Sequence, residues 1–227
     1  MPHEILLVGL DVGTTSIKAV VYRPDGTPVA RGSVPTPTHY PQPGWAYFLA
    51  DELWDCCVAV LREALANVPD PKAIAGIAVA SVGESVVPIA ADGTASGEVV
   101  SWFDTRTRPQ AEWLDTVIGK DEIFRRTGLS LQPIFSLCKL LWFKEERPEA
   151  FARTVKWMMV ADYIAWRLSG EAVTDLSLAS RSLMMNLQSF EWDQDVLAAE
   201  TPGDVVSDHH PFHGASERFG TLFLEPE

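Results

Sequence analysis

The chain has 227 residues, with 18 Lys and Arg against 31 Asp and Glu, and a formal net charge of −13 at pH 7. Hydrophobic residues make up 47% and charged residues 22%, a balance typical of globular proteins and unlike that of disordered chains. The acidic excess argues against a nucleic-acid partner, because phosphate backbones are met by a surplus of Lys and Arg. The length allows one large domain or two small ones.

The N-terminal sequence and the cysteines predict a compartment. The apolar run from Ile5 to Leu10 is short and lacks the basic region and cleavage site of a signal peptide. No stretch approaches the roughly 18 uninterrupted apolar residues of a membrane span. The three cysteines, Cys56, Cys57 and Cys138, indicate packing roles and not a disulfide framework. We therefore expect a cytoplasmic protein with no membrane partner.

Hydrophobic patterning predicts strands first and helices later. Strands are predicted at residues 5–10, 17–23, 28–34, 74–80, 86–90 and 99–103. The first three form an antiparallel meander, because Asp25-Gly26 marks a turn between the second and third. A helix begins at Asp51, with an apolar stripe at Trp54, Val58, Leu61, Leu65 and Val68. Further helices are predicted near residues 109–118, 121–127, 136–147 and 160–169, which indicates an α/β fold.

The polar loop between the first two predicted strands, Asp11-Val-Gly-Thr-Thr-Ser-Ile-Lys18, has the composition of a phosphate-binding loop. Such a loop needs inward-facing N–H groups, and Gly13 offers room and unusual backbone angles. Hydroxyl donors and a cation follow at Thr14, Thr15, Ser16 and Lys18. Asp11 ends a buried strand, where its carboxylate can hold Mg²⁺ directly or through water. The alternative is a polar hairpin turn without a ligand. The spacing differs from that of the Walker P-loop.

This loop resembles the first phosphate motif of the actin/hexokinase/Hsp70 superfamily, and later segments resemble the FGGY carbohydrate kinases. Those segments are Gln42-Pro-Gly-Trp45 with Trp54, Trp102-Phe-Asp-Thr-Arg106, Thr127-Gly-Leu129 with Ser136-Leu-Cys-Lys-Leu-Leu-Trp142, Asp162-Tyr163 through Glu171, and Thr174-Asp-Leu-Ser-Leu-Ala-Ser180 with Trp192-Asp193. Their consistent order over residues 5–197 argues against chance agreement.

The resemblance implies a fold and a reaction. The fold is a ribonuclease-H-like domain with a mixed five-stranded sheet and helices on both sides. The reaction is ATP-dependent phosphorylation of a sugar or polyol hydroxyl, with ATP and Mg²⁺ as cofactors, and it depends on placement and charge neutralisation. The implied ATP-phosphate residues are Asp11, Gly13, Thr14, Thr15, Ser16 and Lys18, with Asp11 as the Mg²⁺ ligand.

The resemblance also implies substrate-binding roles for Glu84, Trp102, Asp104 and Arg106. Glu84 follows a buried strand, at a strand end where ligands of α/β proteins collect, and it matches a glutamate of glycerol kinases. Gly83 replaces the arginine of those enzymes, and Ile134 replaces a tyrosine. These differences favour a pentulose, a related ketose or another polyol over glycerol. The alternative for Glu84 is a solvated loop residue.

Asp104 and Arg106 have two interpretations. Two residues apart in an extended segment, they lie on one side of it, where they hold a sugar hydroxyl or brace each other as an ion pair. Trp102 lies on that side too, either as a core residue or as a ring that stacks on a sugar. Asp175 and Ser177 match a family motif, but their spacing favours a local side-chain turn.

The matches end near Leu197, so we expect a kinase N-terminal domain at residues 1–200 and a tail at residues 201–227 that does not match the family. We expect the tail histidines, His209, His210 and His213, to belong to a flexible polar segment and not to a metal site. In the family the adenosine pocket and the catalytic base lie in a C-terminal domain, and the surroundings of Asp204 do not fit that base. We therefore expect the chain to be inactive alone.

The expected partners are a sugar or polyol substrate and the missing C-terminal kinase domain. An exposed cleft face would also permit a homodimer. The alternative function is a non-catalytic sugar-binding or assembly module of actin-like fold. A filament protein fits the hairpin but not the later segments.

Overall fold

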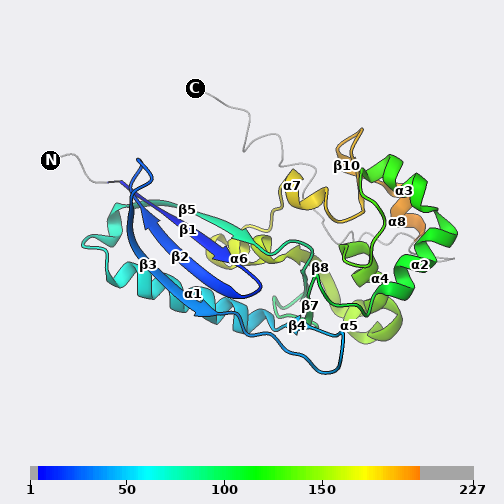
Figure 1. Cartoon of the computed structure of the whole chain (residues 1–227), viewed down its shortest axis with the longest axis horizontal. Coiled ribbons are helices and arrows are strands. Elements are labelled where there is room, and N and C mark those ends of the chain that lie inside the picture. The colour runs from blue at the N-terminus through cyan, green and yellow to red at the C-terminus, as the bar shows by residue number, and fades with distance from the viewer. Residues whose placement is uncertain (1–4, 200–227) are drawn as a thin grey trace.

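A mixed sheet forms the first part of the computed structural model, which describes residues 5–199. Three strands, β1 (Leu6–Val12), β2 (Ser16–Tyr22) and β3 (Pro28–Pro35), form the predicted antiparallel meander. Gly26, at a φ of 85°, allows the tight turn between β2 and β3. Strand β5 (Ile74–Ser81) then pairs with β1 in parallel, which gives the order β3-β2-β1-β5 (Figure 1).

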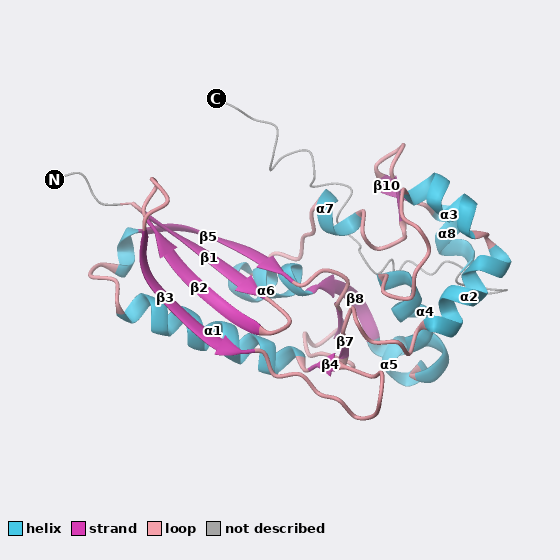
Figure 2. Ribbon diagram, in the orientation of Figure 1, coloured by secondary structure: helices cyan, strands magenta, loops and turns pink. Residues whose placement is uncertain are grey.

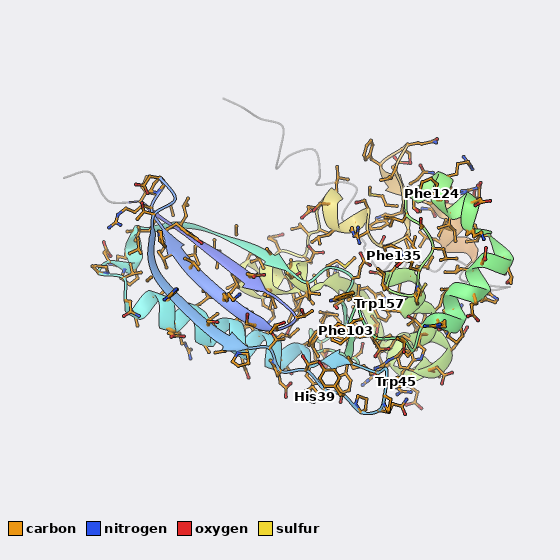
Figure 3. All side chains as sticks on the ribbon, viewed as in Figure 1. His39, Trp45, Phe103, Phe124, Phe135 and Trp157 are labelled. Carbon is orange, nitrogen blue, oxygen red and sulfur yellow. The ribbon has the colours of Figure 1, made fainter. Side chains whose placement is uncertain are left out.

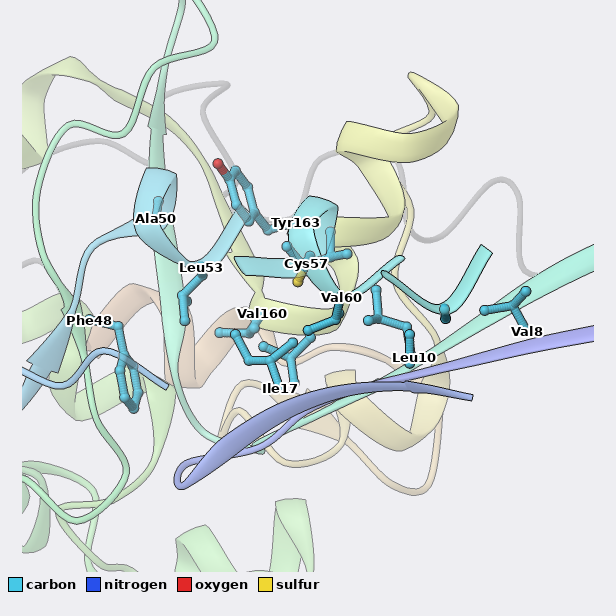
Figure 4. Close-up of a cluster of buried hydrophobic side chains, with 14 of the residues drawn as sticks. Val8, Leu10, Ile17, Phe48, Ala50, Leu53, Cys57, Val60, Val160 and Tyr163 are labelled. Atoms are coloured by element: carbon cyan, nitrogen blue, oxygen red, sulfur yellow. The ribbon is translucent and has the colours of Figure 1, made fainter. Parts of the chain in front are cut away.

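Helix α1 (Ala50–Ala66) packs on this sheet and shares a hydrophobic core with α6 (Val160–Ser169), as Figure 4 shows. Its buried residues are Ala50, Leu53, Cys57, Val60 and Ala64. Four of them lie one position before a member of the predicted stripe. The stripe members Trp54, Val58, Leu61 and Leu65 are themselves only half-buried. The smaller side chains face the sheet because α1 approaches it closely: a Cβ added to Gly32 on β3 would lie 2.4 Å from the Val60 carbonyl oxygen.

Helices cover one face of this sheet in the described residues. On β1, the buried Leu6, Val8, Leu10 and Val12 alternate with the exposed Leu7 and Asp11. The described sheet therefore has four strands where five were predicted, and covering helices on one face where two were predicted. The mixed α/β architecture itself is confirmed.

Two short ladders lie between the sheet and the helical part, and a third lies within the helical part. Strand β6 (Val86–Ala90) pairs with β8 (Thr154–Met159), which was not predicted and which follows the unpredicted helix α5 (Pro148–Arg153). Strand β4 (Tyr47–Phe48) pairs with β7 (Val99–Val100), which is shorter than the predicted strand at residues 99–103. The third ladder joins β9 (Met185–Asn186) and β10 (Glu191–Trp192). A 3₁₀ turn, η1 (Pro71–Ala73), precedes β5.

The helical part forms a second core. Its predicted helices are confirmed as α2 (Arg108–Val117), α3 (Lys120–Thr127) and α4 (Ser136–Glu146). Two short helices, α7 (Leu176–Ala179) and α8 (Gln194–Ala199), complete it. Helices α2, α3, α4, α5 and α8 gather at the end of the molecule away from the four-stranded sheet, as Figure 2 shows. Helix α4 is the centre of this core, because every side chain from Ser136 to Phe143 is buried.

The sequence also led to predictions about a membrane span and about the C-terminal tail. Within residues 5–199, no helix combines the length and the apolarity that a bilayer span requires. The predicted tail at residues 201–227, with Asp204, His209, His210 and His213, lies outside the described residues.

Candidate functional site

The loop between β1 and β2 is anchored by the chain that follows β3. The N–H of Gly13 donates to the Ser16 carbonyl oxygen (3.1 Å), which closes the hairpin. Thr36 donates its hydroxyl to the Gly13 carbonyl oxygen (2.6 Å) and its N–H to the Thr15 carbonyl oxygen (3.1 Å). The loop backbone is therefore held before any ligand arrives, a property that lowers the entropic cost of binding.

Gly13 serves this loop by its size. A Cβ built at Gly13 would lie 3.0 Å from the Ser16 carbonyl oxygen and 3.9 Å from Oδ1 of Asp11. Its backbone is not in the left-handed region that six other glycines adopt. The predicted need for room is confirmed, and the predicted unusual backbone angles are wrong.

Asp11 and Lys18 lie opposite each other in the hairpin. The register of β1 and β2 makes them Cα partners, and directly opposed residues of an antiparallel pair project to the same side. Both are exposed, and Asp11 alternates with the buried residues of β1, which places the pair on the open face of the sheet. A carboxylate and an ammonium group therefore stand together at the base of the loop.

A cavity of about 500 Å³ brings the loop together with four other segments. Its lining residues are Asp11, Gly13, Thr14, Ser81, Val82, Gly83, Glu84, Trp102, Ile134 and Arg181. The N–H of Val82 donates to the Val12 carbonyl oxygen (2.8 Å), which extends the parallel pairing of β1 and β5 and keeps the segment after β5 beside the loop. The cavity thus lies at the carboxyl ends of two parallel strands, the usual ligand position in α/β proteins.

Glu84 is a buried carboxylate in the wall of this cavity. Its backbone has a φ of 62°, in the left-handed region, and its residue is 3% exposed. Oε2 accepts hydrogen bonds from the N–H and the hydroxyl of Ser136 (3.2 and 3.3 Å). Oε1 lies 3.3 Å from Nε of Arg181, an ion pair whose geometry is not that of a hydrogen bond. This buried oxygen therefore has no hydrogen-bond donor among the described residues.

Charge around Glu84 is balanced by two cations. Burial raises the pKa of the Glu84 carboxyl above its ordinary value, while the charges of Lys139 and Arg181 act in the opposite direction. Lys139 is fully buried, donates from Nζ to the Ile134 carbonyl oxygen (2.9 Å), and has its pKa lowered by burial. The cavity wall consequently carries a carboxylate flanked by cations from α4 and from the segment after α7.

Trp102 lies in the same cavity, whereas Asp104 and Arg106 do not line it. Trp102 is 42% exposed and its ring contacts Phe103 edge-on (5.6 Å between centroids). Figure 3 labels Phe103, the ring that Trp102 contacts. An exposed aromatic face in a cavity is suited to pack against the carbon skeleton of a sugar.

Asp104 and Arg106 brace each other, which is one of the two roles that their spacing allowed. Oδ2 of Asp104 accepts from NH2 and Nε of Arg106 (2.8 and 3.0 Å) and from the N–H of Ala46 (2.5 Å). NH1 of Arg106 donates to Glu98 (3.0 Å), and its guanidinium lies 3.9 Å from the centre of the Trp45 ring. The pair joins the 42–45 segment to the helical part.

Arg181, Ser136 and Lys139 belong to this site although the sequence did not single them out as site residues. A signal was present for Lys139, because a lysine inside an apolar helical run is rarely buried without a charged or polar partner. Arg181 carries no comparable local signal, since its place beside Glu84 depends on contacts across 97 positions of the sequence.

A larger cavity of about 600 Å³ lies elsewhere, lined in part by Trp45, Glu52, Glu98, Arg106 and Arg147. It shares no lining residue with the cavity at the hairpin loop. Volume alone would favour it, but the smaller cavity holds the loop, the buried carboxylate and the exposed indole. We therefore place the candidate site in the smaller cavity.

The proteins similar to this chain include carbohydrate kinases. A glycerol kinase from Saccharolobus islandicus is 33% identical over 98% of this chain, which spans 46% of that protein. A gluconate kinase structure from Lactobacillus acidophilus superimposes with a TM-score of 0.81 at 27% identity, over 87% of this chain and 40% of that one. A xylulose kinase structure from the same organism gives a TM-score of 0.80 at 28% identity, over 86% and 39%.

The chain thus spans less than half the length of these relatives. A model of the N-terminal domain of the FGGY family of carbohydrate kinases matches residues 6–221. That range contains the hairpin loop, the cavity and the segments after β5 and α7. The chain therefore belongs to the FGGY family of carbohydrate kinases.

Proposed function

We propose that this chain supplies the phosphate-facing and sugar-facing walls of an ATP-dependent carbohydrate kinase. The observation that carries this proposal is the single cavity that joins the hairpin loop to Glu84 and Trp102. Phosphoryl transfer requires the acceptor hydroxyl and the phosphate to lie in line and close together, and this cavity offers a site for each.

The loop is the proposed contact for the ATP phosphates. Backbone groups of the loop and the hydroxyls of Thr14, Thr15 and Ser16 would donate to phosphate oxygens, and Lys18 would add a positive charge. Asp11 faces the cavity as an exposed carboxylate. That fits Mg²⁺, which keeps several waters and binds through one or two carboxylates and the phosphates. When bound, Mg²⁺ would neutralise charge on the transferred phosphoryl group.

Glu84 and Trp102 are the proposed substrate contacts. Oε1 of Glu84 would accept a hydrogen bond from a substrate hydroxyl, and the Trp102 ring would cover the carbon skeleton. Asp104 and Arg106, with their polar atoms turned to each other, would act by holding the wall that carries Trp102. Relatives named for glycerol, gluconate and xylulose support a sugar or polyol as the substrate class.

Binding of glycerol, D-xylulose and D-gluconate to the 227-residue chain tests this site by isothermal titration calorimetry. We expect one of the three to bind, and Trp102→Ala to weaken its affinity about fivefold, since loss of an aromatic contact costs about 1 kcal/mol. The matched control is Phe124→Ala on α3, an aromatic of similar exposure outside the cavity, which Figure 3 labels. Equal weakening by both substitutions, or no binding of any probe, contradicts the proposed site.

Turnover by the chain alone is expected to be negligible. We assign no described residue as the general base, and a base must lie within hydrogen-bond reach of the hydroxyl that it activates. An assay of ADP release with ATP, Mg²⁺ and each of the three probes measures this. Robust phosphorylation by the purified 227-residue chain would place the base within it. That result would refute the proposal that the chain supplies the two binding walls without the base.

A further inference from the structure

Arg181 lies at the mouth of the cavity without an assigned role. Its side chain is 49% exposed, its Nε lies 3.3 Å from Oε1 of Glu84, and its guanidinium sits 5.7 Å from the centre of the Phe135 ring. Lys139 balances Glu84 from the protein interior, whereas Arg181 does so from the solvent side. The two cations therefore hold the carboxylate from opposite environments.

The segment that presents Arg181 is fixed at both ends. Oδ1 of Asp175 accepts from the N–H groups of Ser177 (2.7 Å) and Leu178 (3.0 Å) and caps helix α7, which confirms the predicted side-chain turn. At the other end, the Ser182 carbonyl oxygen accepts from the N–H of Leu137 (3.1 Å) at the start of α4. The neighbouring residue of α4, Ser136, is the one that binds Oε2 of Glu84.

These contacts connect the 175–182 segment to the cavity wall. The Asp175 cap and the bond from Leu137 place Arg181 and Ser136 on either side of one carboxylate. Each oxygen of Glu84 then has its own partner, Oε2 with Ser136 and Oε1 with Arg181. A carboxylate held in this way has a fixed orientation, which a hydrogen bond to one particular substrate hydroxyl requires.

We propose that Arg181 is a positioning residue of the carbohydrate site: its charge holds Oε1 of Glu84 at the cavity wall, so that this carboxylate is oriented to accept a hydrogen bond from the substrate. The inference rests on the proposed substrate role of Glu84. The other charged or titratable groups near Glu84 are Lys139 and the Cys138 thiol on α4 and Asp11 across the cavity. Of these groups, only Lys139 and Arg181 favour the ionised carboxylate.

The first test measures Glu84 directly and needs no substrate. In the ¹³C-labelled 227-residue chain, the side-chain carboxyl resonance of Glu84 is titrated in the wild type, Arg181→Gln, Arg181→Lys and Arg125→Gln. Arg125→Gln is the matched control, because Arg125 is also about half exposed and ion-paired, but with Glu122 on the surface of α3. We expect Arg181→Gln to raise the titration midpoint of Glu84 by about one pH unit. Arg181→Lys should keep the midpoint close to that of the wild type, and Arg125→Gln should leave it unchanged. An unchanged midpoint in Arg181→Gln overturns the proposal.

The second test measures binding of glycerol, D-xylulose and D-gluconate to the same variants at pH 7 by calorimetry. Arg181→Gln is expected to weaken binding about tenfold and Arg181→Lys less, while Arg125→Gln binds like the wild type. Wild-type affinity in Arg181→Gln overturns the positioning role. If the wild type binds none of the three probes, the proposed function fails, and the carboxyl titration still decides whether Arg181 controls Glu84.

Discussion

Gly32→Ala is expected to lower the free energy of unfolding by about 3 kcal/mol, because overpacking that cannot relax by rotamer changes costs about this much. The added Cβ would lie 2.4 Å from the Val60 carbonyl oxygen and 3.0 Å from the Glu63 side chain. The Val60 oxygen is a backbone atom in the middle of α1, so relief requires the helix and β3 to separate. That movement opens the core in which Cys57 and Val60 are fully buried.

Chemical denaturation of Gly32→Ala and Gly76→Ala measures this effect against a matched control. Gly76 lies on β5 of the same sheet, and a Cβ there meets no atom within 4 Å. Gly76→Ala should therefore be neutral or stabilise by about 0.5 kcal/mol, since glycine in a strand costs conformational entropy. If both variants have the stability of the wild type, α1 does not approach β3 as closely as the structure indicates.

The same substitution connects the fold to the candidate site. Strand β3 leads directly into Thr36, whose hydroxyl and N–H anchor the hairpin loop at Gly13 and Thr15. A shift of β3 away from α1 would loosen these bonds. The geometry of the hairpin loop therefore depends on one glycine that faces a helix and does not line the cavity.

Local patterns account for what the sequence predicted well. The meander over β1 to β3 and helices α2, α3, α4 and α6 follow from apolar periodicity and turn residues, which act over a few positions. The stripe of α1 was displaced by one residue because Trp54, Val58, Leu61 and Leu65 are each bulkier than the residue before them, which faces the sheet. The less bulky row faces the sheet because the helix and the sheet approach each other closely.

Contacts between distant segments account for what was missed. Strand β8 has mixed burial and gains its identity from pairing with β6, about 70 positions earlier in the chain. The hairpin loop, Glu84 and Trp102 line one cavity, and the loop lies beside Glu84 because the ends of the parallel strands β1 and β5 meet at one edge. The ion pair of Arg181 with Glu84 depends on how α7 packs beside α4, which no spacing in the sequence specifies.

Asp162→Asn is expected to stabilise the chain more at pH 8 than at pH 5, by about 2 kcal/mol. Asp162 is 7% exposed near the start of α6, its Oδ2 has no hydrogen-bond partner, and burial raises its pKa from 3.8 to about 7. The folded state therefore binds this proton more tightly than the unfolded state. The stabilising contribution of the protonated carboxyl is complete below about pH 3.8 and is lost as the pH rises through about 7. Asparagine stays neutral throughout, so its advantage grows over this range.

Urea denaturation at pH 5 and pH 8 of the wild type, Asp162→Asn and Asp121→Asn tests this dependence. Asp121 also lies in the first turn of a helix, α3, but it is exposed, so its substitution should change stability by at most about 0.5 kcal/mol at either pH. Glu84 titrates in every variant and cancels in the comparison. The N–H of Val160, at the start of α6, donates to the Ser85 carbonyl oxygen (3.2 Å), next to Glu84. A charge at Asp162 therefore weakens the helix that supports the cavity wall. If Asp162→Asn stabilised the chain equally at both pH values, Asp162 would not be a buried carboxyl with a raised pKa.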